Sequence, residues 1–338
     1  MSSAGPAQPA PVRGRPAPIL SRRTALLCAA VTIAVLPFVF TDAYWRTNLI
    51  ICALNVMLAI GLDFVIGYAG QLNLGQSAFY GLGAYVSTLL ITKLGIPFWI
   101  AFAVAIAFSC LAGIVLSLFA VRLRGHYLAI ASLGFAVITY QILLNWISLT
   151  QGPLGIYAIP PPPTLALSGL PVIDFHDLAN LLYLVAGFAL LSYLLLDQLI
   201  RSPIGETLTA IREDEVSAAS LGINCGAWKV FAFGVGSAVA GAAGCFYASF
   251  VGTLVPDAFF ITESFTILAM VVVGGMGTLI GPVCGAILLT VLPEFLRAIG
   301  DLRLVVYGVA VTLVVLFIPG GIAQAARLAF DRLQRLPR

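Results

Sequence analysis

The chain has 338 residues, of which 61% are hydrophobic and only 9% are charged, and its mean hydropathy is +1.06. Ordinary soluble domains carry roughly a quarter charged residues. This composition excludes the soluble class and indicates a membrane protein surrounded by the lipid bilayer. We expect no nucleic-acid partner for it.

The cysteines and lysines of the sequence argue against metal, disulfide and nucleotide-binding sites. The six cysteines are scattered, without metal-ligand spacing or a disulfide framework. The only lysines, Lys93 and Lys229, lie outside any phosphate-binding loop. We therefore expect no metal, no cofactor and no ATP-binding site in this chain. If this protein uses ATP, another polypeptide must hydrolyse it.

In chain order, residues 1–24 are rich in Pro, Ala and Arg and predict a disordered tail. Residues 25–322 form the predicted transmembrane domain, and residues 323–338 a basic tail. A membrane span needs about 20 apolar residues, sometimes fewer. The sequence predicts an all-α protein with about ten spans, or eight to ten because three are short: 25–40, 48–66, 76–92, 98–120, 127–148, 178–199, 229–251, 262–274, 281–297 and 303–319.

The positive-inside rule orients these spans. With the N-terminus in the cytoplasm, thirteen of the 17 Lys and Arg residues fall on the cytoplasmic side. Both termini are then cytoplasmic, as is the stretch 202–224, and the Pro-rich loop 149–177 is outside. Small residues four apart predict close helix packing; they are Ser109, Gly113 and Ser117 in one span and Gly236, Ala240 and Gly244 in another.

Two segments interrupt the apolar pattern. They read GYAGQLNLGQSAF at 67–79 and VVVGGMGTLIGPVCGA at 271–286. Non-helical backbone at membrane depth is tolerated only inside protein or beside a water-filled cavity, and discontinuous helices often border a substrate path. Ordinary turns at the membrane surface are the alternative. The candidate path residues are Gln71, Asn73, Gln76, Gly274, Gly275 and Gly277.

One stretch is far more polar than the rest of the chain. It reads SPIGETLTAIREDEVSAASLGIN at 202–224. Ser202 and Pro203 predict a helix start, and Gly222 predicts a stop. A solvated loop helix is the usual fate of such a charge run. Acidic charge beside an anionic leaflet disfavours lipid adhesion, so we favour docking of a protein partner.

The sequence resembles a known family, the permease subunits of bacterial branched-chain amino-acid ABC importers, and in particular their M-type subunit. The likeness covers about residues 45–325 in matching order. It rests on the stretch 202–224 and on GYAGQLNLGQSAFYGLGAY at 67–85, RLRGHYLAIASLGFAVITYQILLNW at 122–146, SFTILAMVVVGGMGTLIGPVCGA at 264–286 and FIPGGI at 317–322. The sequence departs from the family pattern at Glu206, Asn73, Gln151 and Leu154, which weakens any naming of the substrate.

The resemblance implies a type II-like ABC importer permease in the bacterial inner membrane. A homologous H-type permease would complete the path, two ATP-binding cassette subunits would dock from the cytoplasm, and a periplasmic binding protein would deliver substrate. The stretch 202–224 matches the coupling segment. We expect its apolar residues to fill a groove on the ATPase and its charges to set the orientation: Ile204, Leu208 and Ile211, then Arg212, Glu213, Asp214 and Glu215, with Gly222 as the stop.

Other functions fit less well. An ion-coupled secondary transporter usually keeps ionisable residues near the midplane, whereas Asp63, Asp197, Glu263 and Glu294 fall near predicted span ends. A membrane enzyme would need paired catalytic groups, and the sequence has only two histidines and no carboxylate pair at useful spacing. A permease of the same family that carries urea or a short amide stays open.

Overall fold

The computed structural model describes residues 42–120, 126–164 and 174–296, with a few isolated positions between 308 and 322. Within this part the chain is helical apart from loops and one isolated β-bridge between Ile156 and Leu254. The longer helices are α2 (Ala43–Asp63), which continues as the π-helix η1 (Phe64–Tyr68), α3 (Gln76–Leu94), α4 (Phe98–Ala120), α5 (His126–Asn145), α7 (Leu178–Arg201), α10 (Cys225–Val251), α11 (Ile261–Gly274) and α12 (Ile280–Phe295).

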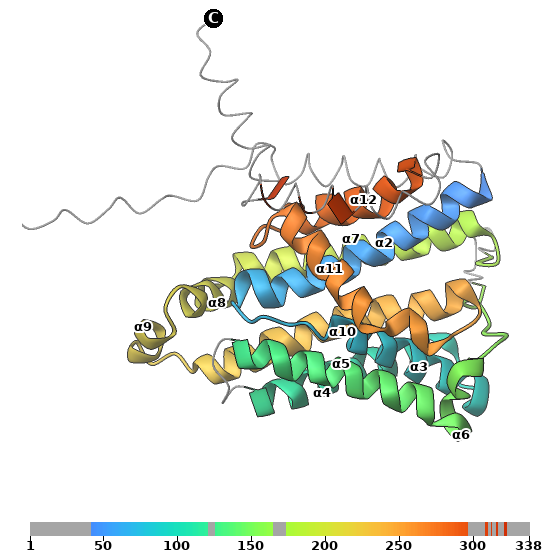
Figure 1. Cartoon of the computed structure of the whole chain (residues 1–338), viewed down its shortest axis with the longest axis horizontal. Coiled ribbons are helices and arrows are strands. Elements are labelled where there is room, and N and C mark those ends of the chain that lie inside the picture. Colours follow the sequence, from blue (N-terminus) through green and yellow to red (C-terminus); the bar gives the residue numbers. More distant parts are fainter. Residues whose placement is uncertain are drawn as a thin grey trace, which may run out of the picture.

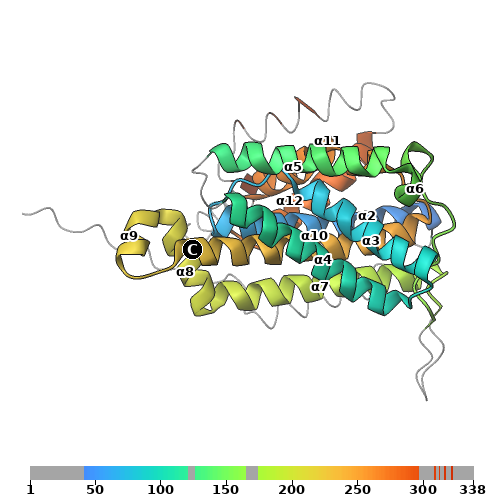
Figure 2. The ribbon, with the colours of Figure 1, turned by 90° about the horizontal axis from the view of Figure 1, so that it is seen from below.

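Five short elements connect the long helices. They are α6 (Ile147–Thr150), the 3-10 turn η2 (Gly152–Leu154), α8 (Pro203–Glu213), α9 (Glu215–Ser220) and the 3-10 turn η3 (Pro256–Phe259). Helices α8 and α9 project from one end of the bundle, and α6 lies at the other end (Figures 1 and 2).

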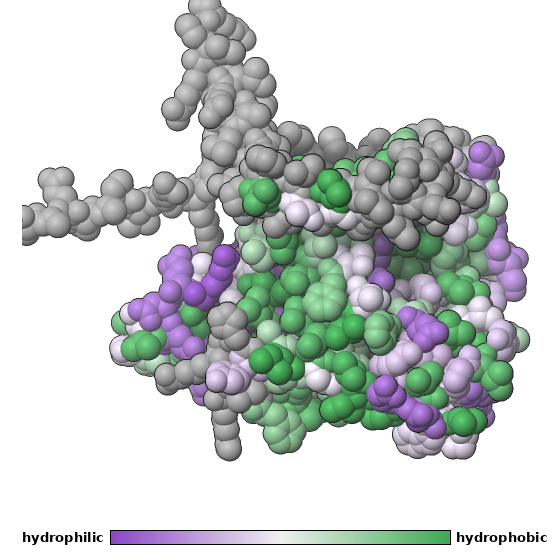
Figure 3. Space-filling model, in the orientation of Figure 1, coloured by the Kyte–Doolittle hydropathy of each residue, from purple (hydrophilic) through white to green (hydrophobic). Residues whose placement is uncertain are grey.

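Six helices of the described part are long and apolar enough to cross a membrane, and α12 is a shorter apolar helix. The all-α class and the membrane-spanning character are thus confirmed, whereas the number ten stays a prediction. The predicted spans 25–40 and 303–319 and both predicted tails fall mainly or wholly outside the described residues. The surface fits a lipid environment, because apolar side chains cover the middle of the visible face and hydrophilic ones gather towards its two ends (Figure 3).

Helices α2 and α10 form the centre of the bundle. The most apolar 18-residue stretches of α2 and α10 are 78% and 67% buried, whereas those of α4 and α7 are each 28% buried. Since these helices are apolar on all faces, hydrophobicity alone cannot orient them, and close packing of small residues does so instead. A Cβ atom on Gly83 of α3 would lie under 3.0 Å from the backbone of Gly241 in α10. The predicted close packing is confirmed at Gly113, Gly236 and Gly244, where an added Cβ would lie under 3.0 Å from atoms of a neighbouring helix.

Candidate functional site

The first interruption is an extended segment, residues 69–75, that runs from the α8 end of the bundle inward to the start of α3 (Figure 1). The amide side chains of the segment and of the first residue of α3 are buried, with Gln71, Asn73 and Gln76 exposed by 3%, 1% and 0%. The structure therefore places these amides inside the protein, whereas Gly70 and Leu72 are exposed. A protein interior is the setting in which a membrane protein tolerates non-helical backbone.

Each amide hydrogen-bonds within the chain. Gln71 Nε2 donates to the Lys229 carbonyl (2.9 Å), and Asn73 Nδ2 donates to Gln76 Oε1 (3.0 Å). Gln76 Nε2 donates to the Leu58 carbonyl (3.4 Å), and Asn73 Oδ1 accepts from the Gly75 N–H (2.8 Å). These bonds replace the ladder that a helix would supply, so the amides fix the path of the segment through the bundle.

The inner ends of two helices meet near this segment. Ser264 Oγ, in the first turn of α11, accepts from the Ser77 N–H (2.9 Å) in the first turn of α3, and the two hydroxyls are 2.8 Å apart. Both serines are buried. The N-terminal turns of α3 and α11 are therefore joined inside the protein by a polar contact.

The second interruption is the turn between α11 and α12. Gly275 and Gly277 adopt positive φ angles of 114° and 77°, which a side chain would strain. A Cβ on Gly274 would meet the Gly281 carbonyl at a distance that real atoms never show. Glycine is needed here both for backbone conformation and for close approach.

The structure brings the two interruptions together. A Cβ on Gly67 would lie 2.5 Å from the Gly277 nitrogen, and the Gly277 N–H donates to Asp63 Oδ1 (2.8 Å). Asp63 is fully buried at the end of α2, and its Oδ2 has no hydrogen-bond partner among the described residues. Sequence reasoning noted Asp63 only as an acidic residue near a span end. The sequence signal that could have identified Asp63 is its position four residues before Gly67, because a glycine there leaves room for the carboxylate.

The charged stretch forms two helices, α8 and α9, whereas a single short helix between Ser202 and Gly222 was expected. The Ser202 hydroxyl accepts from the Ile204 N–H (3.2 Å), which confirms the predicted cap of α8. Asp214 then takes an extended conformation and caps α9, and its carboxylate accepts from the Val216 N–H (2.9 Å). Gly222, at φ 85°, ends α9 as predicted.

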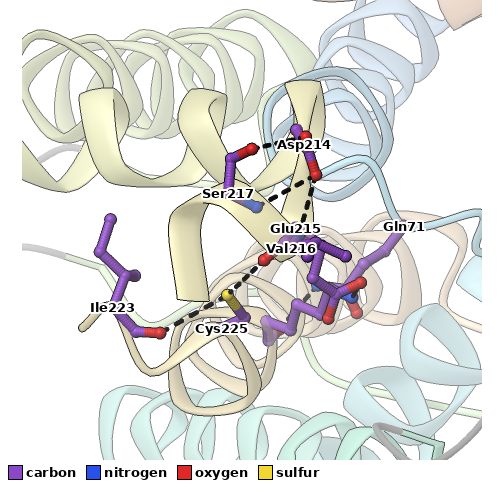
Figure 4. A network of polar contacts seen from close by, with 8 residues as sticks. Gln71, Asp214, Glu215, Val216, Ser217, Ile223 and Cys225 are labelled. Atoms are coloured by element: carbon purple, nitrogen blue, oxygen red, sulfur yellow. Dashed lines mark hydrogen bonds and ion pairs between the residues drawn. The ribbon is translucent and has the colours of Figure 1, made fainter. Parts of the chain in front are cut away.

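Several charged side chains of this stretch bond within the chain itself. Glu215 Oε2 pairs with Lys229 Nζ at 2.7 Å, and the Arg212 guanidinium donates to the Gly67 carbonyl. Figure 4 shows the network around Asp214, Glu215 and Gln71. The hydrogen bond from the Ser217 hydroxyl, with backbone N–H groups, lowers the pKa of Asp214 below its usual value.

The apolar residues of this stretch face two ways. Leu208 and Ile211 are buried against the chain's own core, and not outward as expected, and Ile204 is half-buried. The exposed apolar side chains are Val216 (76%) and Leu221 (82%) on and after α9. A partner that reached this end would therefore meet these two side chains first.

Apolar spanning helices, two adjoining interruptions with buried amides and closely packed glycines, and a charged helical pair at one end together define a multi-pass membrane transport protein. A family model described as the branched-chain amino acid transport system permease component matches residues 47–318. The chain belongs to this family.

Individual relatives agree with this assignment. The chain is 36% identical over 290 residues to the high-affinity branched-chain amino acid transport system permease protein LivM of Escherichia coli, covering 80% of this chain and 68% of LivM. It is 27% identical over 251 residues to LivH of the same organism, covering 69% of this chain and 78% of LivH. A probable LivM of Methanocaldococcus jannaschii is 25% identical over 241 residues, covering 69% and 64%. No solved structure matches.

Proposed function

We propose that this chain is one permease subunit of an ABC importer and forms half of the path for branched-chain or related amino acids. The observation that carries the proposal is the non-helical segment 69–75, whose amide side chains are buried inside an apolar bundle, in a chain of the branched-chain amino acid permease family. The substrate class follows from the names of its relatives.

The path lies along the two interruptions in this proposal. Gln71, Asn73 and Gln76 border it on one side, and the glycines at 274, 275 and 277 on the other. Amide groups suit a path for a zwitterionic substrate, because they are polar but carry no net charge, and a fixed charge in a low-dielectric path would hold the ligand strongly. The same chemistry would admit urea or a short amide, which makes substrate choice an outcome of the assay.

In this proposal the assembly contains three kinds of partner protein besides this chain. A homologous H-type permease completes the path, two ATP-binding cassette subunits bind and hydrolyse ATP, and a periplasmic protein delivers substrate. The chain itself catalyses no reaction and holds no cofactor. Its similarity to both LivM and LivH supports pairing with a homologous permease.

In this proposal the protein lies in the inner membrane with a type II-like fold of about ten spans. Both termini and the α8–α9 end face the cytoplasm. The distribution of Lys and Arg supports this orientation. The ATPase then docks on α9, where Val216 and Leu221 are exposed. A cysteine at Leu221 should react with an impermeant maleimide only from the cytoplasm, and one at the exposed Tyr157 only from outside.

The function is tested with the purified importer in liposomes. Labelled leucine, isoleucine, valine and urea are each offered with the binding protein outside and ATP inside. We expect ATP-dependent uptake of the aliphatic amino acids, and none from the permease chain alone. Uptake of urea in their place would reassign the substrate, and uptake driven by an ion gradient without ATP would refute the importer.

A further inference from the structure

Arg212, at the last turn of α8, lies over the first interruption. Its Nη1 donates to the Gly67 carbonyl, 145 residues away in the sequence. The side-chain stem lies along the same segment, because a Cβ on Gly70 would be 3.0 Å from Arg212 Cγ. An exposed arginine on a projecting helix usually extends into solvent, whereas this one is placed on the chain's own backbone.

The same guanidinium also lies beside the second interruption. A Cβ on Gly277 would be 2.8 Å from Arg212 Nη1 and 3.2 Å from the Gly67 carbonyl. From the other side, buried Asp63 accepts from the Gly277 N–H (2.8 Å). The junction of Gly67 and Gly277 is therefore held from the α8 side by Arg212 and from within the bundle by Asp63.

The glycines are necessary to this arrangement. A side chain at position 67 would overlap the Asp63 carboxylate, and one at position 277 would displace the Arg212 guanidinium. Both glycines also carry backbone polar groups that Arg212 and Asp63 use. The stem of Arg212 packs against Gly70, so a displacement of α8 must either carry the Gly67 carbonyl with it or break this hydrogen bond.

We propose that Arg212 and Asp63 are positioning residues for transport, and that they tie the place of helix α8 to the junction of Gly67 and Gly277. This proposal rests on the proposed function, in which the ATPase acts on the α8–α9 end. A shift of that end then moves both interruptions together. Arg212 acts within its own chain, in contrast to the expectation that it orients the ATPase.

The link is tested first without any partner. Leu279, only 6% exposed in the same turn, is changed to cysteine in the full chain in membrane vesicles. Maleimide labelling at position 279 is followed by mass spectrometry, which keeps the native cysteines from interfering. Losing a charge-assisted hydrogen bond corresponds to roughly a tenfold change, so Arg212→Gln should raise the labelling rate by about that factor.

The matched control removes another charged arginine. Arg201, the last residue of α7, pairs with Asp197 at 2.8 Å and makes no hydrogen bond to Gly67 or Gly277 within the described residues. Arg201→Gln should leave the labelling rate at position 279 unchanged, and Arg212→Lys should restore most of the protection. An Arg212→Gln rate equal to that of Arg201→Gln would overturn the proposal.

The assembled importer gives the second readout. Arg212→Gln and Asp63→Asn should each lower substrate uptake per ATP hydrolysed, while the ATPase subunits still co-purify. Unchanged uptake per ATP in both variants would overturn the positioning role. Failure of the wild-type complex to take up any amino acid would instead count against the proposed function, and the labelling experiment would still decide whether Arg212 holds the turn.

Discussion

Gln76→Leu removes one polar side chain from the centre of the first interruption. Gln76 is fully buried, accepts from Asn73 Nδ2 at 3.0 Å and donates to the Leu58 carbonyl at 3.4 Å. Leucine has a similar volume but no acceptor. The change therefore leaves the Asn73 amide without this partner inside the bundle and introduces little steric strain.

The magnitude follows from these two bonds. A buried donor left unsatisfied costs about 1–3 kcal/mol, and the longer bond at 3.4 Å contributes less. Since about 1.4 kcal/mol is a factor of ten, the equilibrium constant for the native arrangement of the segment falls roughly 5- to 150-fold. The helices around it keep their packing, so we expect uptake to fall, by at most that factor, while the complex still assembles.

The assay measures initial uptake of labelled leucine alongside recovery of all subunits. Gln198→Leu is the matched control. It makes the same chemical change at a glutamine that is exposed on α7. It should transport normally. Normal uptake by Gln76→Leu, with subunit recovery equal to that of the control, would refute the argument that this amide fixes the segment.

Three further predictions concern packing, docking and pH. Gly83→Ala should lower the thermal midpoint in detergent, because overpacking costs about 1–3 kcal/mol, whereas Gly187→Ala, with open space around it, should not. Glu213→Lys should reduce co-purification of the ATPase subunits without changing the midpoint, since this exposed side chain makes no hydrogen bond or ion pair within the described residues. The depressed pKa of Asp214 means that its cap on α9 is present above the unfolded-state pKa and lost as pH falls through the folded pKa. A spin label at Val216 should therefore become mobile at acid pH, and Asp214→Asn should remove that transition.

Local patterns predicted the helices well, because a long apolar run in a membrane protein has few alternatives. The predicted span 98–120 coincides with α4, and 178–199 differs from α7 by two residues at one end. The division of the charged stretch at Asp214 was also readable, since aspartate is a strong N-cap residue. We had interpreted Asp214 only as a charge for a partner.

The contacts of the site were not readable from local pattern. Gln71 bonds to a carbonyl 158 residues away, and Arg212 to one 145 residues away. Nothing in the spacing around either residue encodes such a partner. The burial of Leu208 and Ile211 could not be predicted for a related reason. An amphipathic helix shows which of its faces is apolar but not what covers that face.

The glycines of the two interruptions differ from flexible hinges in a way that limits how the site can move. At positions 67, 274 and 277 an added Cβ would collide with backbone or charged groups, whereas at Gly134 and Gly187 it would meet nothing within 4 Å. Glycine is therefore used at the junction for close contact, and a closely packed junction is not continuously deformable. If the α8 end drives transport, the two interruptions must shift as one unit against α3 and α10, and the flanking helices must absorb the motion.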